Sequence, residues 1–335
     1  MQTSPIAFET TVAQLPRVQT ASPGATPRAW PKAWAQALDH IQARVENGYI
    51  AAALDDLFDE LSVRREDEGE TWPTYASACL SHSLCGLLHQ DPFTHRAFSK
   101  PRGYAGDAVM MDYIYGLGEA APAARQATPL GRAIFRYMDT RPSARAVRFR
   151  RGLIAGLIDS LPSRGGSTVF ALAAGHLREI EISKAIQNGR IQDFMAVDQD
   201  EASLAVVARD YSHLGVEAIQ GSVRQILAGT LNPGRFDFVY AAGLFDYLNA
   251  SAAIALTRRM FEMTRPGGMT LIPNFLTGAR DRGYMESFMD WRLIYRDHAD
   301  MQTLADALPS TDVADRRIFD DPDDTITFLL VTKAR

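Results

Sequence analysis

A turn of small residues and a later carboxylate have the spacing of a nucleoside-binding site. The apolar run 169–172 leads into Ala173 and Gly175, whose small size lets the backbone turn sharply and lets a ligand approach it. Asp198 ends the next apolar run, about 20 residues after the turn, and Gln199 follows it. A carboxylate in this position accepts hydrogen bonds from ribose hydroxyls. The pattern therefore predicts a ribose site at Asp198.

The same turn limits which nucleosides fit. It contains a single glycine, so it is not the G-x-G-x-x-G loop that holds a dinucleotide pyrophosphate at a helix N-terminus. A nucleoside without phosphate groups needs fewer glycines. An NAD-binding oxidoreductase is thus a weaker alternative than an enzyme that binds a phosphate-free nucleoside.

Further candidate residues follow the later apolar runs. In a parallel sheet the carboxyl ends of the strands line one ligand crevice, so residues just after successive runs should meet there. These residues are Ser222 and Val223 after the third run, Gly243 and Phe245 after the fourth, and Asn274 after the fifth.

The elements that must position these residues are strands and helices in alternation. Short apolar runs separated by helical segments predict right-handed βαβ units and a mainly parallel sheet, with a helix rising from about Glu179. We expect a Rossmann-like α/β domain over residues 146–335, with strands at 168–173, 194–197, 216–220, 236–241, 269–273 and 325–332.

The N-terminal half has a helical period instead. Apolar residues recur at spacings of three and four from Trp34 onward, which predicts an all-helical domain over residues 30–145 that covers the site as a lid. Within it, the charged run 64–70 is expected to be a connector. Residues 1–29 contain four prolines among polar residues, and we expect them to be flexible.

Residues 91–106 (DPFTHRAFSKPRGYAG) differ from the helical stripes around them. They combine proline, glycine and cations with spaced aromatic side chains, which predicts an irregular path. Arg102 and Tyr104 lie in this segment, and Asp107 can cap the helix that resumes after it. We expect residues 98–107 to close over a ligand bound at the strand ends.

Over about residues 150–335, the ordered set of turn, acid and strand-end residues resembles the class I S-adenosylmethionine (SAM)-dependent methyltransferases. The N-terminal half is similar to bacterial methyltransferases of fatty-acid methyl ester biosynthesis, the extracellular factor or 3-hydroxypalmitate type. This architecture also resembles azetidine-2-carboxylate synthases, which cyclise SAM itself. The segments that carry the resemblance are Asp91–Phe93, Arg96–Phe98, Lys100–Asp107, Ile114–Tyr115, Ala242–Tyr247 and Asp290–Arg296.

The resemblance implies a mostly parallel sheet with an antiparallel last strand, and SAM as cosubstrate or sole substrate. For methyl transfer to a small or fatty carboxylic or hydroxy acid, Arg102 or Arg296 could orient a carboxylate. For cyclisation, aromatic side chains would stabilise the sulfonium and a polar group would hold the amine. The residues expected to act in catalysis are Tyr104, Asp107, Asn274 and Tyr295, and those expected to bind SAM are Arg102, Tyr115, Ala173, Gly175, Asp198, Gln199, Ser222, Val223, Gly243 and Phe245.

Composition excludes several other classes. The formal net charge of -5 does not favour a nucleic-acid partner, and no run reaches the length of a membrane span. Neither Cys79 and Cys85 nor the histidines have metal-ligand spacing, so no metal site is predicted. The two cysteines suit a reducing compartment, and we expect a cytoplasmic protein with a small-molecule substrate. A non-catalytic SAM-binding module stays an alternative, and the acceptor, stereochemistry and oligomeric state are open.

Overall fold

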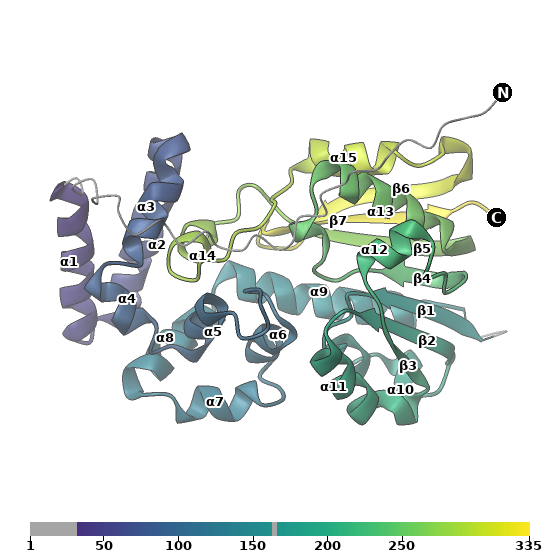
Figure 1. Cartoon of the computed structure of the whole chain (residues 1–335), viewed down its shortest axis with the longest axis horizontal. Helices are drawn as coiled ribbons and strands as arrows, with labels where there is room; N and C mark the ends of the chain where they lie inside the picture. Colours follow the sequence, from purple (N-terminus) through teal and green to yellow (C-terminus); the bar gives the residue numbers. More distant parts are fainter. Residues whose placement is uncertain (1–31, 163–165) are drawn as a thin grey trace.

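The computed structural model describes residues 32–162 and 166–335, so the expectation for residues 1–29 lies outside the described residues. Its strands form one seven-stranded sheet in the order β3-β2-β1-β4-β5-β7-β6 (Figure 1). Strand β7 is antiparallel to both of its neighbours, and the other pairs are parallel. This confirms the predicted sheet. The strands are β1 (Ser167–Leu172), β2 (Ile191–Asp198), β3 (Val216–Gln220), β4 (Phe236–Tyr240), β5 (Thr264–Phe275), β6 (Val313–Asp320) and β7 (Ile326–Lys333).

Alternate residues of the central strands enter two different cores. Val169 and Ala171 of β1 share a core with α9 (Pro142–Asp159) and α11 (Glu201–Tyr211). Phe170 and Leu172 face the opposite core, with α12 (Val223–Ala228), α13 (Ala250–Glu262) and α15 (His298–Asp306). Because both faces are covered, β1 is buried along its whole length, which explains its unbroken apolar run.

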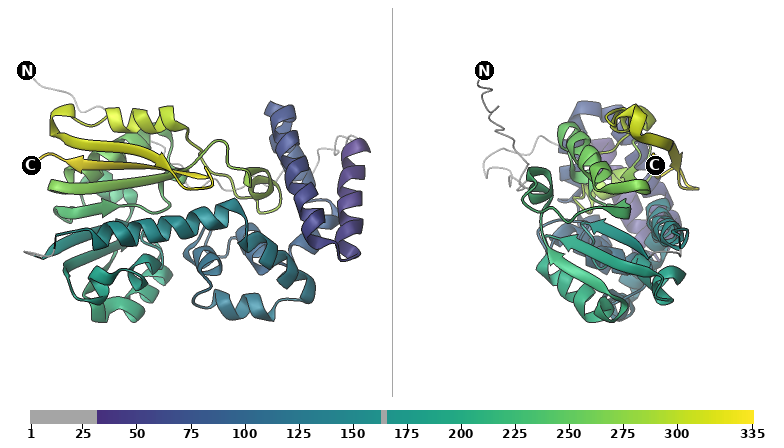
Figure 2. Two further views of the ribbon diagram at one scale, coloured as in Figure 1. Left: turned by 180° about the vertical axis from the view of Figure 1, so that it is seen from behind. Right: turned by 90° about the vertical axis from the view of Figure 1, so that its right-hand side faces the viewer.

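Eight helices precede α9 in the described part of the chain, and we call them the helical half; α9 and everything after it form the α/β half. Helix α9 runs along the sheet and reaches the helical half at its start (Figure 2). The helices of the helical half are α1 (Lys32–Glu46), α2 (Ile50–Glu68), α3 (Trp72–Cys79), α4 (Ser83–Leu88), α5 (Pro92–Ser99), α6 (Ala108–Tyr115), α7 (Ala120–Gln126) and α8 (Pro129–Asp139).

A segment after β5 returns to the helical half. It contains α14 (Arg282–Ser287), which packs against α2 and α3. The ring of Tyr284 stacks on Phe58 at 4.8 Å between centroids, and Trp72 Nε1 donates to the carboxylate of Glu286. The two halves are thus joined by chain segments in both directions, and the domain boundary near residue 145 remains a prediction.

The structure corrects three expectations about elements. The charged run after residue 63 continues α2 to Glu68 and is not a connector, since its charges lie on a solvated helix face. Residues 92–99 form α5, because Asp91 caps its N-terminus by accepting from the amides of Phe93 and Thr94. After Gly175 there is a 3₁₀ turn, Arg178–Glu181, and the four-residue α10 (Lys184–Gln187) in place of a long helix.

Candidate active site

A cavity of about 200 Å³ lies at the carboxyl ends of the strands, where residues of α6 and α9 face the loops after β1, β2 and β4. This is the crevice at which parallel α/β sheets bind ligands, beside the point where the strand order reverses between β1 and β4. Most predicted site residues line it: Tyr104, Tyr115, Ala173, Gly175, Asp198, Gln199, Ser222, Val223 and Gly243.

The turn after β1 is held by Asp198, the residue that is predicted to bind the ribose. One oxygen of Asp198 accepts from the amide of Gly175 at 2.8 Å, and the other accepts from the amide of Asp200 at 2.8 Å. Ala173 and Gly175 both have positive φ, of 51° and 56°. Burial raises the pKa of Asp198, although the backbone hydrogen bonds oppose that effect. The carboxylate thus shapes the turn and also lines the cavity.

Ser222 caps the helix that follows β3. Its hydroxyl accepts from the amide of Gln225, and the Gln225 side chain accepts from the Ser222 amide, which makes a capping box at the start of α12. Ser222 thus fixes the start of α12, and both Ser222 and Val223 line the cavity.

Three predicted catalytic residues do not line the cavity. Asp107 is fully buried and caps α6 by accepting from the amide of Met110. Its carboxylate also accepts hydrogen bonds from Nε and Nη2 of Arg96. Asn274 donates to the carbonyls of Phe275 and Ile294. Tyr295 carries the Arg282 guanidinium over its ring at 4.0 Å. Each side chain is used to hold segments together, and none contacts the cavity.

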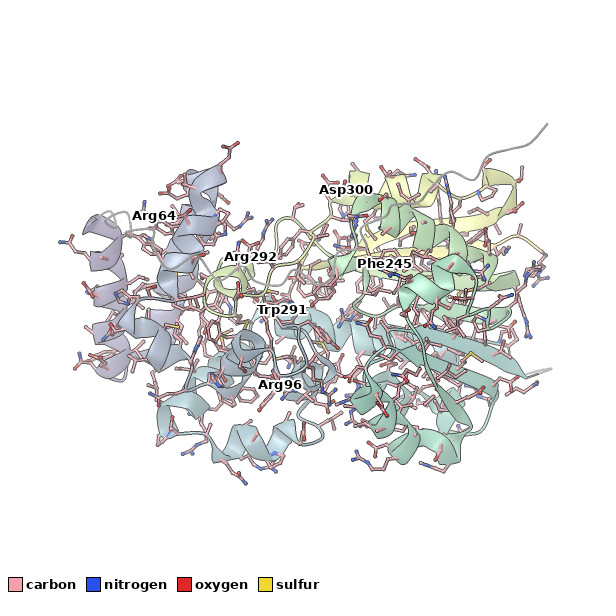
Figure 3. All side chains as sticks on the ribbon, viewed as in Figure 1. Arg64, Arg96, Phe245, Trp291, Arg292 and Asp300 are labelled. Atoms are coloured by element: carbon pink, nitrogen blue, oxygen red, sulfur yellow. The ribbon has the colours of Figure 1, made fainter. Side chains whose placement is uncertain are left out.

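The cavity lining also lacks two predicted SAM-binding residues, Arg102 and Phe245, and the candidate cation Arg296. Phe245 lies in the loop after β4 (Figure 3), but its ring is fully buried in the core cluster that includes α13 and does not line the cavity. Arg296 donates to the carbonyls of Phe245 and Leu248 and to the side-chain oxygen of Asn274. With its nitrogens committed inside the protein, Arg296 cannot orient a substrate carboxylate.

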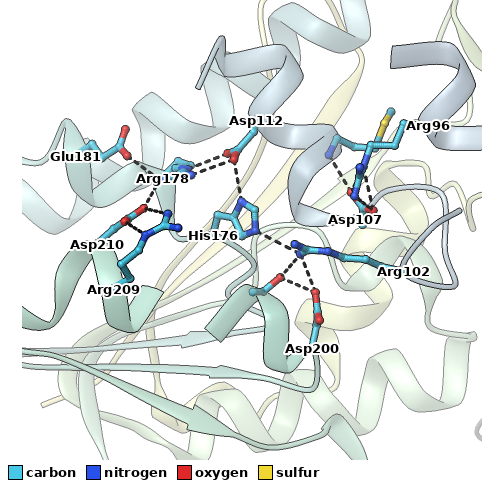
Figure 4. Close-up of polar contacts among 12 residues, drawn as sticks. Arg96, Arg102, Asp107, Asp112, His176, Arg178, Glu181, Asp200, Arg209 and Asp210 are labelled. Atoms are coloured by element: carbon cyan, nitrogen blue, oxygen red, sulfur yellow. Dashed lines mark hydrogen bonds and ion pairs between the residues drawn. The ribbon is translucent and has the colours of Figure 1, made fainter. Parts of the chain in front are cut away.

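Arg102 fastens its loop to the α/β half. One guanidinium nitrogen donates to Asp200 at 2.8 Å and to Ser203 at 2.9 Å, and it lies 3.3 Å from His176 Nε2 (Figure 4). His176 Nδ1 lies 2.8 Å from Asp112, whose other partner is Arg178. Burial alone would raise the pKa of Asp112, but the hydrogen bonds from His176 and Arg178 lower it. The loop and α6 are therefore fixed to the turn after β1 by one connected network.

An aromatic wall (Tyr104, Tyr247 and Trp291) closes one side of the cavity. The rings of Tyr104 and Tyr247 meet edge to face at 6.5 Å, and Trp291 Nε1 donates to the Tyr247 hydroxyl at 2.9 Å. Trp291 lies at the junction of the two halves (Figure 3). Trp291 lies in the segment Asp290–Arg296 that carries the family resemblance, but it was not among the predicted site residues.

Gly106 sets how closely the loop approaches this wall. A Cβ on Gly106 would lie 2.5 Å from the Tyr247 hydroxyl and 2.6 Å from the Trp291 ring, closer than atoms pack. We expect Gly106→Ala to displace the wall and lower kcat/KM about tenfold or more, since small misplacements near reacting atoms are costly. Gly278→Ala is the control, because a Cβ there meets no atom within 4 Å and its φ is not in the left-handed region. Equal activity of the two variants would contradict a role for this contact.

Four charged residues of the cavity were not among the predicted site residues: Arg150 on α9, Arg178 and Glu179 after the turn, and Asp246 after β4. All four are buried. Burial raises the pKa of Glu179, whose carboxylate accepts from the Tyr240 hydroxyl, and raises the pKa of Asp246 to about 6. Asp246 lies inside Ala242–Tyr247, one of the segments that carry the family resemblance, next to the predicted Phe245. Arg150 is one of several arginines on its helix, and no sequence pattern distinguishes it.

Residues 169–268 match the family model described as a methyltransferase domain. The match begins in β1 and includes the turn, Asp198 and the loop after β4. This part of the chain is therefore similar to a methyltransferase domain. A comparison with curated proteins found no match.

Solved structures similar to the chain include a possible exported protein from Bordetella parapertussis, with 15% identity, a TM-score of 0.51, and coverage of 78% of this chain and 97% of that one. Another is the CurJ carbon methyltransferase, with 12% identity, a TM-score of 0.48, and coverage of 84% and 71%. A third is the N-methyltransferase NodS from Bradyrhizobium japonicum WM9 in complex with S-adenosyl-L-homocysteine, with 12% identity, a TM-score of 0.42, and coverage of 59% and 91%. The Bordetella protein shares the fold of most of this chain.

The match to a methyltransferase domain supports SAM as the molecule that binds at these strand ends. In the two described ranges, no group of three or more histidine, cysteine, aspartate or glutamate side chains is placed to hold a metal ion. No helix there is long and apolar enough to cross a membrane.

If the segment over residues 98–107 closes over bound SAM as predicted, the ligand should slow its opening. We expect hydrogen exchange of amides 103–107 to slow when S-adenosylhomocysteine is added, because cavity contacts from Tyr104 and Gly106 would be added to the Arg102 network. Helix α2, which does not line the cavity, serves as the internal control. Equal exchange of the loop with and without ligand would mean that it does not close on SAM.

Proposed function

We propose that this protein transfers the methyl group of SAM to an oxygen atom of a small or fatty hydroxy or carboxylic acid. The observation that carries the proposal is the extent of the cavity. Beyond the strand-end residues it continues to Phe275, Trp291 and Leu293, which come from outside the matched methyltransferase domain. A second molecule at that end would lie beside the methyl donor.

The strand ends suggest how SAM lies. We assign the ribose to Asp198 and Gln199 and the adenine to the corner of Ser222 and Val223, as the order of strands in nucleoside-binding sheets implies. The methionine part then extends across Gly175 toward the loop after β4. This places the sulfonium near the aromatic wall, whose ring faces attract a cation.

Asp246 is the candidate general base for a hydroxyl acceptor. The acceptor oxygen attacks the methyl carbon in line with the sulfur, the new O–C bond forms as the S–C bond breaks, and the hydroxyl proton passes to the Asp246 carboxylate. The sulfur leaves as the neutral sulfide of S-adenosylhomocysteine. A pKa of about 6 for Asp246 leaves the carboxylate ionised near neutral pH.

The lining favours an acceptor with an apolar body. Phe275, Trp291, Leu293 and Val147 face this end of the cavity. The guanidinium groups of Arg102 and Arg296 already donate hydrogen bonds to protein groups, so neither is available to bind an acceptor carboxylate. Methylation at a hydroxyl, which Asp246 can deprotonate, therefore fits better than methylation at a carboxylate.

Cyclisation of SAM to azetidine-2-carboxylate, with release of methylthioadenosine, is the second candidate. The observation that favours it is the aromatic wall, since Tyr104 and Tyr247 could hold the sulfonium in a folded conformation. It requires a neutral amine, and Glu179 on the cavity lining could accept the proton. A non-catalytic module does not account for the buried charged groups. The free thiols of Cys79 and Cys85 suit the cytoplasm, where we place the protein.

The experiment is label transfer from methyl-labelled SAM to a panel of acids. The panel pairs short and long chains, each with and without a hydroxyl group. We expect labelled product from hydroxylated acids, with S-adenosylhomocysteine in equal amount. Absence of label in every acid would contradict the proposal.

A further inference from the structure

Arg150 is a buried cation that faces the cavity without a carboxylate partner. It is 5% exposed, and its guanidinium lies against the backbone of Gly243, 3.5 Å from where a Cβ would be. Its hydrogen-bond partners are uncharged: the sulfur of Met111, 3.5 Å from Nη2, and the hydroxyl of Tyr115. In the described residues no carboxylate oxygen lies within 4.0 Å of it, whereas Arg96, Arg102 and Arg178 each have one below 3 Å.

Such an arrangement is costly unless an anion binds there. A buried guanidinium loses its hydration, and a weakly accepting thioether sulfur together with one tyrosine hydroxyl restores only part of it. Glu179 and Asp246 act on Arg150 only at longer range, through their charges. A ligand carboxylate could receive both guanidinium nitrogens in a bidentate contact.

Glu179 has the opposite charge on the same cavity. It is 6% exposed, and one carboxylate oxygen accepts from the hydroxyl of Tyr240. Burial raises its pKa, so a cation bound beside it would be favoured because it restores the charged form. Arg150 and Glu179 thus present one cation and one anion to a single ligand, without neutralising each other in a direct ion pair.

From this geometry we propose that Arg150 and Glu179 form a clamp for the α-carboxylate and α-ammonium groups of SAM. The inference rests on the proposed placement of the ribose at Asp198, on β2. From there the amino-acid part of SAM reaches across β1 to Glu179 and to Gly243 after β4, where Arg150 lies. An amino acid is the ligand class that carries these two charges on one carbon atom.

The clamp also orients the reaction. An ammonium group held beside a carboxylate stays protonated and cannot attack carbon, so SAM is kept as a methyl donor. The clamp further selects SAM over nucleosides that lack either charge, because an unmatched buried charge on the protein would remain.

Calorimetric binding of three nucleosides tests the clamp: SAM, decarboxylated SAM and methylthioadenosine, which lacks both groups. The wild-type protein should bind SAM about 10- to 100-fold more tightly than decarboxylated SAM, the scale of one charged hydrogen-bond pair. Arg150→Met should remove this preference and leave methylthioadenosine binding unchanged. Glu179→Gln should weaken SAM and decarboxylated SAM alike. Arg150→Lys, which keeps the charge without the planar fork, should keep part of the preference.

Arg151→Met is the matched control. Arg151 is the next residue on α9, but it pairs with Glu181 at 2.8 Å and does not line the cavity. A preference for SAM that survives Arg150→Met would overturn the inference. If Arg150→Met leaves SAM binding intact but raises KM for the acceptor, Arg150 binds the acceptor instead, and the proposed methyl transfer would stand without the clamp. Loss of the preference in a protein that methylates no acid would support the clamp and contradict the proposed function.

Discussion

Asp246→Asn should lower kcat for a hydroxylated acceptor by about 10²- to 10⁴-fold, the contribution of a general base. Asparagine keeps the oxygen that accepts from the Phe275 amide at 2.7 Å, so the loop after β4 should keep its position. Its amide cannot take the hydroxyl proton. The measurement is single-turnover methyl transfer at saturating SAM. A variant whose rate is within about threefold of wild type would show that Asp246 is not the base.

The same residue predicts the acidic side of the pH profile. A protonated Asp246 cannot accept a proton, so kcat/KM should fall as the pH is lowered through about 6, the pKa to which burial raises this group. The positive charge of the sulfonium favours the ionised form of Asp246, so the pKa of Asp246 should be lower in the SAM complex than in the free protein. The acidic limb of the kcat profile should therefore lie at a lower pH than that of the kcat/KM profile. Asp246→Asn should abolish this limb while leaving some residual rate.

Asp198→Ala should weaken SAM binding by about 1–3 kcal/mol, roughly 5- to 150-fold in Kd. The variant loses the ribose ligand, and it also loses the acceptor for the amides of Gly175 and Asp200. Asp198→Asn separates these effects, since its side-chain oxygen can still accept one of the two amides. Calorimetry that finds unchanged SAM affinity in a folded Asp198→Ala protein would exclude the ribose assignment.

The sheet was predictable because its signals are local. Buried parallel strands are short apolar runs, and the runs that end at Leu172, Asp198 and Gln220 are all strands in the structure. Strand β6 was missed because it lies at the sheet edge, and its sequence VADRRIFD has charged residues where a buried strand has apolar ones. Helix α5 was missed because the cap at Asp91 outweighs the irregular composition of the segment.

The site was predictable where a residue's role follows from its place on a strand. Gly175, Asp198 and Gly243 follow strands directly, and all line the cavity. Residues whose roles depend on tertiary partners could not be assigned in this way. Asp107 and Asn274 were predicted to accept hydrogen bonds from a substrate. In the structure their side-chain oxygens accept hydrogen bonds from Arg96 and Arg296 instead. Arg150 became recognisable only once the fold showed which arginine of α9 has no carboxylate beside it.

The most direct test of the account is the nucleoside formed from SAM. The protein should be incubated with SAM alone and with SAM plus a hydroxylated acid, and the products separated by chromatography. We expect no turnover of SAM alone, and S-adenosylhomocysteine in step with methylated acid when the acceptor is present. Methylthioadenosine formed from SAM alone would contradict methyl transfer as the reaction and establish cyclisation in its place.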